Sequence, residues 1–342
     1  MPETKYGLIA LGNALVDVLS QVTDYFIEEQ HKKHGMEKGA MTLIDEIRAV
    51  ELYTNMPQGV ETSGGSAANT MAGYASFGGK GAFIGKVADD ALGKTYATEM
   101  TSLGIEYKTL PLLMGAPTGR CIIMVSPDAQ RTMNTFLGAS VELSPHDVDE
   151  ELIASAKITY LEGYLFDRET AKQAFITAAG YAHKANRKIA LTLSDPFCVD
   201  RHRADFLSLV ENHVDILFAN EDEIKSLYTT EDFDEAISAI NNHVEIAVIT
   251  RSEKGSVIIN GDEIIEIEAI PVQEVIDTTG AGDQYAAGFL YGYTEGYTLE
   301  ECGNFGALAA SEVIAHMGPR PLVSLAELKE SLQIDQKRQA TI

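Results

Sequence analysis

Residues 277–283 (DTTGAGD) form the segment of this chain best suited to chemistry. They precede a stretch of small and apolar residues with helical spacing, whose start Thr278 or Thr279 can cap. The glycines leave backbone N–H groups uncovered at the positive end of that helix, which makes an anion site. Asp283 would repel a lone phosphate, but it can accept the proton of a hydroxyl group that attacks the phosphate. The complete run therefore predicts phosphoryl transfer with Asp283 as general base, whereas an isolated Gly-x-Gly-Asp match is more often an ordinary turn.

A second run, residues 64–69 (GGSAAN), opens another segment of helical spacing. Adjacent glycines allow a polyhydroxylated ring to approach the backbone, and Asn69 can direct its amide at a hydroxyl group. Alternatively, Gly64 and Gly65 form only the turn between a strand and a helix. The run is thus a candidate for binding the molecule that supplies the hydroxyl group.

Acidic residues also follow two of the apolar runs. Asp17 closes the segment 12–17 (GNALVD), where its carboxylate could bind a vicinal diol through two hydrogen bonds or be a solvated turn residue. Asn220 and Glu223 start a helix after another apolar run, and Asn220 is alternatively only the N-cap of that helix. Because acids near a phosphate repel it unless a divalent cation intervenes, we expect Glu223 to hold Mg²⁺ through water.

Short apolar runs rich in Ile and Val alternate with longer segments of helical period. This alternation is typical of parallel strands joined by crossover helices. The expected strands cover residues 8–11, 82–87, 158–161, 189–193, 216–218 and 247–250. The expected helices cover residues 66–77, 90–103, 169–185, 203–212, 221–228, 281–296 and 299–316. The pattern predicts an open, doubly wound α/β fold with a mostly parallel sheet.

Two stretches, residues 14–63 and 106–137, break this alternation. In the second, residues 119–125 and 132–136 have the pattern of paired antiparallel strands around a turn. Such pieces do not easily join a parallel core, so we expect both stretches to form a small β-rich lid over the carboxyl edge of the sheet, where it would cover a ligand. We assign residues 1–330 to one domain that includes this lid, and residues 331–342 to a frayed tail.

The charge of the chain limits its partners. With 26 basic and 51 acidic side chains the formal net charge is −25, which disfavours nucleic acids and anionic membrane surfaces. The three cysteines have no metal-binding spacing, and we expect them to be reduced thiols of a cytoplasmic protein. The sequence contains no apolar run long enough for a membrane span. We expect a monomer or a homodimer that binds small molecules.

The order of these motifs resembles the ribokinase-like (PfkB) family of sugar and nucleoside kinases. The resemblance covers the chain from Leu8 to about Pro321 and includes the runs 64–93, 220–223 and 277–283. Within the family it is similar to the adenosine kinases, on the segments 12–13 (GN), 160–164 (YLEGY), 191–197 (LTLSDPF) and 214–218 (VDILF).

The resemblance implies a role for individual residues at matching positions. Asp283 would be the base. The anion hole would be formed by Gly280, Ala281 and Gly282. The ribose hydroxyl groups would be held by Asn13, Asp17, Gly64, Gly65 and Asn69. An acceptor base would contact Tyr164 and Phe197, and Arg131 in the lid would reach the transferring phosphate. The magnesium complex of ATP would be bound by Asn220, Glu223, Thr250, Gly255 and Asn304.

These inferences converge on an ATP- and Mg²⁺-dependent kinase that phosphorylates the 5′-hydroxyl of adenosine or a related nucleoside. A kinase for a free sugar, such as a ribokinase- or fructokinase-like enzyme, is the alternative within the family. A non-catalytic nucleotide sensor on the same scaffold is an alternative of another class, although a pure binding protein gains nothing from a carboxylate beside phosphate. Met41 stands where animal adenosine kinases have a glutamine that contacts adenine, so the acceptor's base stays open.

Overall fold

A nine-stranded sheet with the order β14-β13-β12-β11-β10-β9-β1-β5-β6 forms the centre of the computed structural model, which describes residues 4–128 and 130–331. Its parallel strands are β1 (Tyr6–Leu11), β5 (Gly81–Ile84), β6 (Glu106–Tyr107), β9 (Ala156–Glu162), β10 (Lys188–Thr192), β11 (Ile216–Asn220) and β12 (Ile246–Thr250). An antiparallel hairpin of β13 (Ser256–Asn260) and β14 (Glu263–Ile267) extends one edge. The doubly wound, mostly parallel sheet that the sequence predicts is therefore confirmed.

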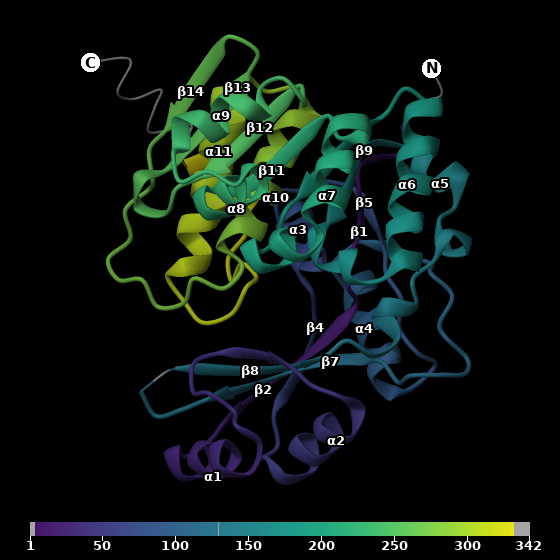
Figure 1. The fold of residues 1–342 in the computed structure, drawn as a ribbon, viewed down its shortest axis with the longest axis vertical. Coiled ribbons are helices and arrows are strands. Elements are labelled where there is room, and N and C mark those ends of the chain that lie inside the picture. The colour runs from purple at the N-terminus through teal and green to yellow at the C-terminus, as the bar shows by residue number, and fades with distance from the viewer. Residues whose placement is uncertain (1–3, 129, 332–342) are drawn as a thin grey trace.

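Helices cover both faces of this sheet (Figure 1). One apolar core lies under α3 (Ser66–Ser76), α4 (Ala91–Ser102), α10 (Ala281–Glu295) and α11 (Leu299–Ile314). The other lies under α5 (Glu150–Ala154), α6 (Glu169–Lys184), α7 (Pro196–His213), α8 (Glu221–Tyr228) and α9 (Phe233–Ile240). Successive strand residues alternate between the two cores, as Leu8 and Ile9 of β1 do. Short 3₁₀ turns occupy Gly138–Glu142, Pro145–Asp147, Gly163–Asp167 and Ser252–Lys254.

A second sheet, with the order β3-β8-β7-β2-β4, forms the lid below the main body in Figure 1. It consists of β2 (Leu15–Gln21), β3 (Met41–Leu43), β4 (Val60–Gly64), β7 (Gly119–Val125) and β8 (Arg131–Phe136), with the helices α1 (Asp24–His34) and α2 (Glu46–Asn55). Strands β7 and β8 pair antiparallel as expected, and β2 pairs with β7 although a long stretch of chain separates them. The expected tail, residues 331–342, lies outside the described residues except for Ser331.

The structure corrects one sequence prediction about elements and extends another. Residues Glu106 and Tyr107, expected in the lid, form β6 and pair with β5 at the edge of the large sheet. The helix expected at 203–212 is present as the second part of α7, after a kink at His202, where φ is −125°. The first part, which the sequence did not predict, begins at Pro196, where the Asp195 side chain accepts hydrogen bonds from the amides of Phe197 and Cys198. Proline suits the first position of a helix, where its missing N–H group has no partner to lose.

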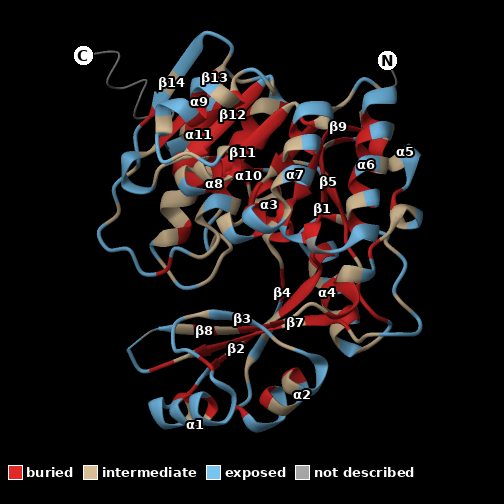
Figure 2. Ribbon diagram, viewed as in Figure 1, coloured by how far each residue is buried: buried red, intermediate tan, exposed pale blue. Residues whose placement is uncertain are grey.

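The two faces of the lid sheet differ in what covers them. Val16, Val18 and Ile122 are fully buried on the face that carries α1 and α2 (Figures 1 and 2). By the strand register, Asp17 and Cys121 lie opposite each other on the other face, as do Leu19 and Ile123. Because successive strand residues alternate between faces, the lid presents Asp17 and a largely apolar surface to the main body.

The turn from β4 into α3 joins the lid to the main body through Gly64 and Gly65. Gly65 has a φ of 100°, and a Cβ atom there would collide with the backbone carbonyl oxygen of Asn13. Gly78, after α3, has a φ of 93° but open space where its Cβ would lie. Only glycine therefore allows the chain after β1 to pass this close to the lid junction.

Because the two glycines differ in this way, we expect alanine to destabilise the protein more at Gly65 than at Gly78. A Gly78→Ala variant should lose about 1–3 kcal/mol of unfolding free energy through backbone strain alone. A Gly65→Ala variant should lose more, because the backbone of Asn13 cannot yield as a side chain can. Urea denaturation of both variants measures the difference, and equal losses would show that the close approach carries no cost.

Candidate active site

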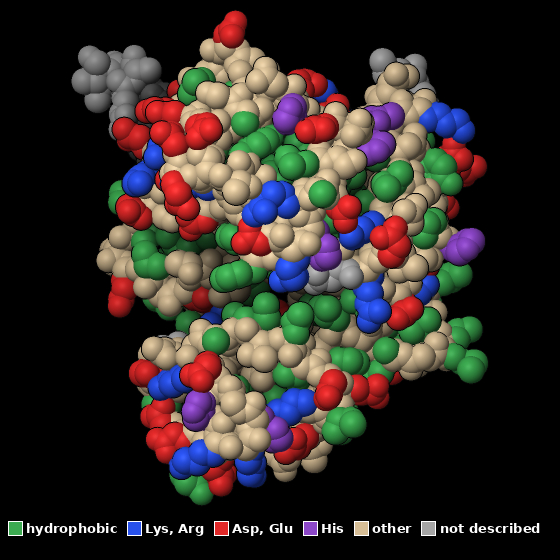
Figure 3. All heavy atoms as spheres, in the orientation of Figure 1, with side chains coloured by type: hydrophobic (Ala, Val, Ile, Leu, Met, Phe, Trp, Pro, Cys, Tyr) green, Lys and Arg blue, Asp and Glu red, His purple; other side chains and the backbone are tan. Residues whose placement is uncertain are grey.

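The predicted site residues come from distant parts of the chain but share one edge of the large sheet. Asn13 follows β1, Tyr164 follows β9 and Phe197 follows β10, while Asn220 and Thr250 end β11 and β12. The carboxyl ends of parallel strands in such sheets form a common ligand-binding edge. In Figure 3 a groove runs between the main body and the lid, with apolar side chains along both of its rims.

Asp283 lies in the first turn of α10 and is held by two residues of α3. Its Oδ1 atom accepts a hydrogen bond from the Ser66 hydroxyl at 2.6 Å, and its Oδ2 atom accepts one from the Asn69 amide at 3.2 Å. Burial raises the pKa of Asp283 to about 6, although these two hydrogen bonds and the charge of Arg320 favour its ionised form. Such a carboxylate is ionised at neutral pH and yet basic enough to accept a proton.

The start of α10 differs from the expected arrangement. Neither Thr278 nor Thr279 caps the helix, because Gly280 with a φ of 79° is the N-cap and Thr279 bonds to Asp277 instead. A Cβ atom at Gly280 would lie 2.6 Å from Pro319, whereas one at Gly282 would meet nothing within 4 Å. Gly280 is thus required by packing, while Gly282 leaves the first-turn amides open, as an anion site needs.

Arg131 connects the lid to the loop that precedes α10. Its guanidinium forms an ion pair with Asp277 and donates a hydrogen bond to the Thr279 hydroxyl at 3.1 Å. Both members of the pair are buried, with side-chain exposures of 9% and 6%. Burial would raise the pKa of Asp277, but hydrogen bonds from Thr279 and Gly318 and the charge of Arg131 bring it below its usual value. The structure therefore places Arg131 against the loop that precedes α10, and its expected contact with the transferring phosphate stays a prediction.

Asp17 faces this loop from the lid. It is half-buried, and a Cβ atom on Gly64 would collide with its carboxylate, so the glycine leaves room for Asp17. Burial raises the pKa of Asp17 to about 6, and the charges of Arg320 and Arg131 act against this rise. Its position between two cations and across from Asp283 is compatible with holding the hydroxyl groups of an acceptor.

Asn13, a predicted ligand of the ribose, has internal partners for both ends of its amide. It donates to Glu162 at 2.8 Å and accepts from the Ser140 hydroxyl at 2.9 Å. Glu162 also accepts a hydrogen bond from the Ala67 amide at 2.8 Å, at the start of α3. Burial raises the pKa of Glu162 to about 7, against these donors. Glu162 thereby joins the end of β1 to the helix that carries Ser66 and Asn69.

Asn220 and Glu223 form a reciprocal capping box at the start of α8. The Glu223 amide donates to the Asn220 side chain at 2.8 Å, and in return the Asn220 backbone amide donates to the Glu223 carboxylate at 3.0 Å. The Asn220 side-chain nitrogen donates to the other carboxylate oxygen at 2.7 Å. Burial raises the pKa of Glu223 to about 7. The structure thus shows Asn220 as the N-cap of α8, and the contact expected between Glu223 and Mg²⁺ through water stays a prediction.

The remaining predicted residues lie around the same edge. Tyr164 and Phe197 are 37% and 74% exposed on its rim. Gly255, with a φ of 80°, has a packing reason of its own, since a Cβ atom there would collide with the carbonyl oxygen of Ile267. Asn304 is half-buried in α11. The roles expected for these residues stay predictions.

Three residues of the site had no role in the sequence analysis. Ser66 and Glu162 lie inside motifs quoted in the sequence analysis. Glu162 could have been recognised because an acidic residue at the end of a buried strand is unusual. Arg320 follows the last long helix, outside any motif, and donates to the Asn69 side-chain oxygen at 3.1 Å.

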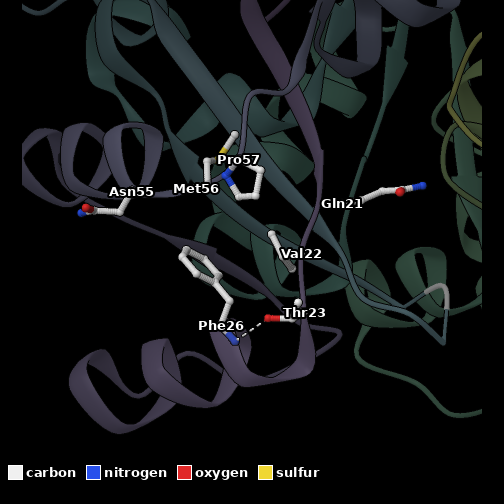
Figure 4. Close-up of a pocket in the computed structure, with 7 residues that line it drawn as sticks. All are labelled: Gln21, Val22, Thr23, Phe26, Asn55, Met56 and Pro57. Atoms are coloured by element: carbon white, nitrogen blue, oxygen red, sulfur yellow. Dashed lines mark hydrogen bonds between the residues drawn. The ribbon is translucent and has the colours of Figure 1, made fainter.

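Within residues 4–128 and 130–331, no three His, Cys, Asp or Glu side chains come together as a metal site, and no helix is long and apolar enough to cross a membrane. A hollow of about 560 Å³ between α1 and the end of α2 is lined by Phe26, Met56, Pro57 and neighbouring residues (Figure 4). It lies on the helix side of the lid, and its lining contains no acid or base.

The Arg131–Asp277 pair predicts that the lid stabilises the loop that precedes α10. An Arg131→Met variant leaves Asp277 buried without its cation, and hydrogen exchange of the amides of Thr279 and Gly318 should become faster. Breaking a buried pair in this way costs about 3–5 kcal/mol. The matched control is Arg120→Met, since Arg120 stacks on Tyr53 at the helix face of the same sheet. Equal exchange in this loop in both variants would contradict the coupling.

Comparison with known proteins agrees with this geometry. The model of the pfkB family carbohydrate kinases matches residues 39–325. The chain is similar to the crystal structure of adenosine kinase from Sinorhizobium meliloti, with 49% identity, a TM-score of 0.88 and coverage of 96% of this chain and 100% of that chain. It is similar to a probable sugar kinase from Rhizobium etli CFN 42, with 47% identity, a TM-score of 0.89 and coverage of 97% and 99%. A 5-dehydro-2-deoxygluconokinase from Geobacillus thermodenitrificans is 27% identical over 84% of this chain and 90% of its own length. The chain therefore belongs to the pfkB family of carbohydrate kinases, which are phosphotransferases.

Proposed function

We propose that this protein is an ATP-dependent kinase that phosphorylates the 5′-hydroxyl group of adenosine or a closely related nucleoside. The observation that carries the proposal is that Asp283, at an open glycine-rich helix start, faces a lid surface that combines one carboxylate, Asp17, with apolar side chains. A proton acceptor, an anion site and a mixed polar and apolar acceptor surface thus meet in one groove.

The chain's own groups account for the expected reaction. Asp283 accepts the proton of the attacking hydroxyl group, and the first-turn amides around Gly282 stabilise the negative charge of the transferring phosphoryl group. Arg131 is the lid residue best placed to reach this charge, by exchanging Asp277 for phosphate. Closure of the lid would exclude water and so limit hydrolysis of ATP.

Mg²⁺ would neutralise charge on the phosphates of bound ATP. The open amides at Gly282 fit an anion, and Glu223, with its oxygens engaged in the capping box, fits a water-mediated contact to the metal ion. We expect Asn220, Thr250, Gly255 and Asn304, at the same edge of the sheet, to contact the nucleotide.

The lid surface favours a nucleoside over a free sugar. Ile123, Met133 and Met41 lie opposite one another across β7, β8 and β3, on the same face as Asp17. Met41 is 49% exposed, so this apolar surface remains available to a flat base. The sequence identity of 49% to a structure described as an adenosine kinase supports a nucleoside as the acceptor.

A free-sugar kinase is the second candidate. The polar cluster of Asn13, Glu162 and Asp17 near the start of α3 could serve a small polyol as well as a ribose. The sequence identity of 47% to a probable sugar kinase is consistent with this second candidate. In this case the apolar lid face would close over the sugar without contacting a base.

A panel of acceptors with ATP and Mg²⁺ separates the two candidates. We expect ADP formation and a phosphomonoester product with adenosine or a related nucleoside, and neither with 5′-deoxyadenosine, which lacks the accepting hydroxyl group. Phosphorus NMR of the product identifies the phosphorylated position. Turnover of ribose or fructose with no turnover of any nucleoside would overturn the proposal in favour of the sugar kinase.

The base assignment predicts a large loss of turnover in Asp283→Asn. The variant should fold normally but lose roughly 10²–10⁴-fold in kcat, because it cannot accept a proton. In the unaltered enzyme, kcat/KM should fall about tenfold per pH unit below a pH of about 6, as Asp283 becomes protonated. Asp234→Asn, an exposed acid in the first turn of α9, is the matched control. Near-normal turnover of Asp283→Asn would remove Asp283 from the mechanism.

A further inference from the structure

Arg320 reaches the base through a chain of hydrogen bonds. It belongs to the segment after α11, and its Nη1 atom donates to the Ser63 hydroxyl of β4 at 2.8 Å. Its Nε atom donates to the side-chain oxygen of Asn69 at 3.1 Å, and the Asn69 amide nitrogen in turn donates to Asp283. The guanidinium therefore lies behind the base, at the junction of the lid and the main body.

The directions of these hydrogen bonds permit only one orientation of the Asn69 side-chain amide. A guanidinium has only donors and an ionised carboxylate has only acceptors, so an amide between them must direct its oxygen to the first and its nitrogen to the second. Without Arg320 the amide could rotate and direct its oxygen at Asp283, where the two oxygens would repel each other. Arg320 thus fixes the donor that the base needs.

The position of Arg320 is itself set by the start of α10. The Pro319 carbonyl oxygen accepts a hydrogen bond from the Gln284 side chain at 2.9 Å, and the Gly318 amide donates to Asp277 at 2.9 Å. Gly280 lacks a Cβ atom where Pro319 packs against it. The first turn of α10, which carries the base, and the loop before it therefore also hold the segment that carries Arg320.

We propose that Arg320 is a positioning residue for the reaction, which holds the Asn69 amide so that its N–H group faces the carboxylate of Asp283. This inference rests on the proposed role of Asp283 as the base. Arg320 itself need not touch the substrate, because its Nη2 atom is inaccessible to solvent and has no hydrogen-bond partner among the described residues.

The electrostatic surroundings of Asp283 explain why such a residue is needed. Ionisable groups from several packed elements influence Asp283 or are influenced by it, and all but one of them are acidic: Asp17 of β2, Tyr160 and Glu162 of β9, Tyr164 after β9, Glu223 of α8, and the cation Arg320. The charge of Arg320 lowers the pKa of Asp283, and so does the hydrogen bond from Asn69. Loss of Arg320 removes the first effect and weakens the second, so the pKa of Asp283 must rise.

The first test measures the titration of Asp283 without any substrate. In protein labelled with ¹³C at the aspartate carboxyl carbons, the signal that disappears in Asp283→Asn belongs to Asp283. Arg320→Met should raise the pKa of this signal by about one unit, and Arg320→Lys by less, because it keeps the charge but loses the planar donor pair. Arg203→Met, which removes a cation paired with Asp200 in α7, should leave the signal unchanged.

The second test measures kinetic coupling between Arg320 and Asn69. Arg320→Met should lower kcat roughly 10–100-fold, with the acceptor KM within about threefold, because the base is affected rather than binding. If Arg320 acts through Asn69, the double variant with Asn69→Ala should be no slower than Asn69→Ala alone, within about twofold. The acid limb of the pH profile of Arg320→Met should move to higher pH.

Two outcomes would overturn the proposal: an unshifted titration of Asp283 in both Arg320 variants, or additive losses in the double variant. If Arg320→Met fails to fold, the titrations of Arg320→Lys and Asn69→Ala still decide. An unchanged pKa of Asp283 in both variants would contradict the proposed link from Arg320 through Asn69. If the unaltered protein phosphorylates no acceptor of the panel, the proposed function fails, while the titration still reports whether Arg320 controls Asp283.

Discussion

The site depends on keeping a buried carboxylate ionised. Burial raises the pKa of Asp283 to about 6, and only the donors of Ser66 and Asn69 and the charge of Arg320 limit that rise. These donors reach Asp283 because α3 and α10 pack very closely. A Cβ atom on Gly73 of α3 would collide with Gln284 and lie 2.8 Å from the Ala287 side chain, so glycine permits the contact. The small residues of the two helices thus serve the chemistry as well as the core.

The lid faces the same carboxylate from the other side of the groove. It contributes Asp17 and Arg131, and Arg131 is joined through Asp277 to the loop that precedes α10. The far face of the lid sheet is buried by α1 and α2, which fixes the side that meets the main body. With a net charge of −25, the protein cannot attract a nucleotide from a distance, and fields beyond about 8 Å are screened at physiological salt. Binding must therefore come from short-range donors such as the open amides near Gly282.

The fold was predictable where local pattern and tertiary structure agree. Alternating apolar runs and helical segments indicated the parallel sheet, and the antiparallel β7–β8 pair followed from its turn. Prediction failed where a contact from elsewhere decided the outcome. Glu106 and Tyr107 belong to the large sheet because they pair with the edge strand β5. Thr279 does not cap α10, because its hydroxyl group donates a hydrogen bond to Asp277. Arg320 was missed because neither its spacing nor its neighbours distinguish it from a surface arginine.

The sequence by itself determined which chemistry is possible. The run 277–283 places a carboxylate at a glycine-rich helix start, and this is a local property of consecutive residues. Only the tertiary structure decided the pKa of that carboxylate and the groups that hold it. Ser66, Asn69, Asp17 and Arg320 lie far from it in the chain, and their positions depend on helix packing, strand register and the lid junction. Hydrogen bonds and charges act over a few ångströms of space, regardless of how many residues separate the groups that share them.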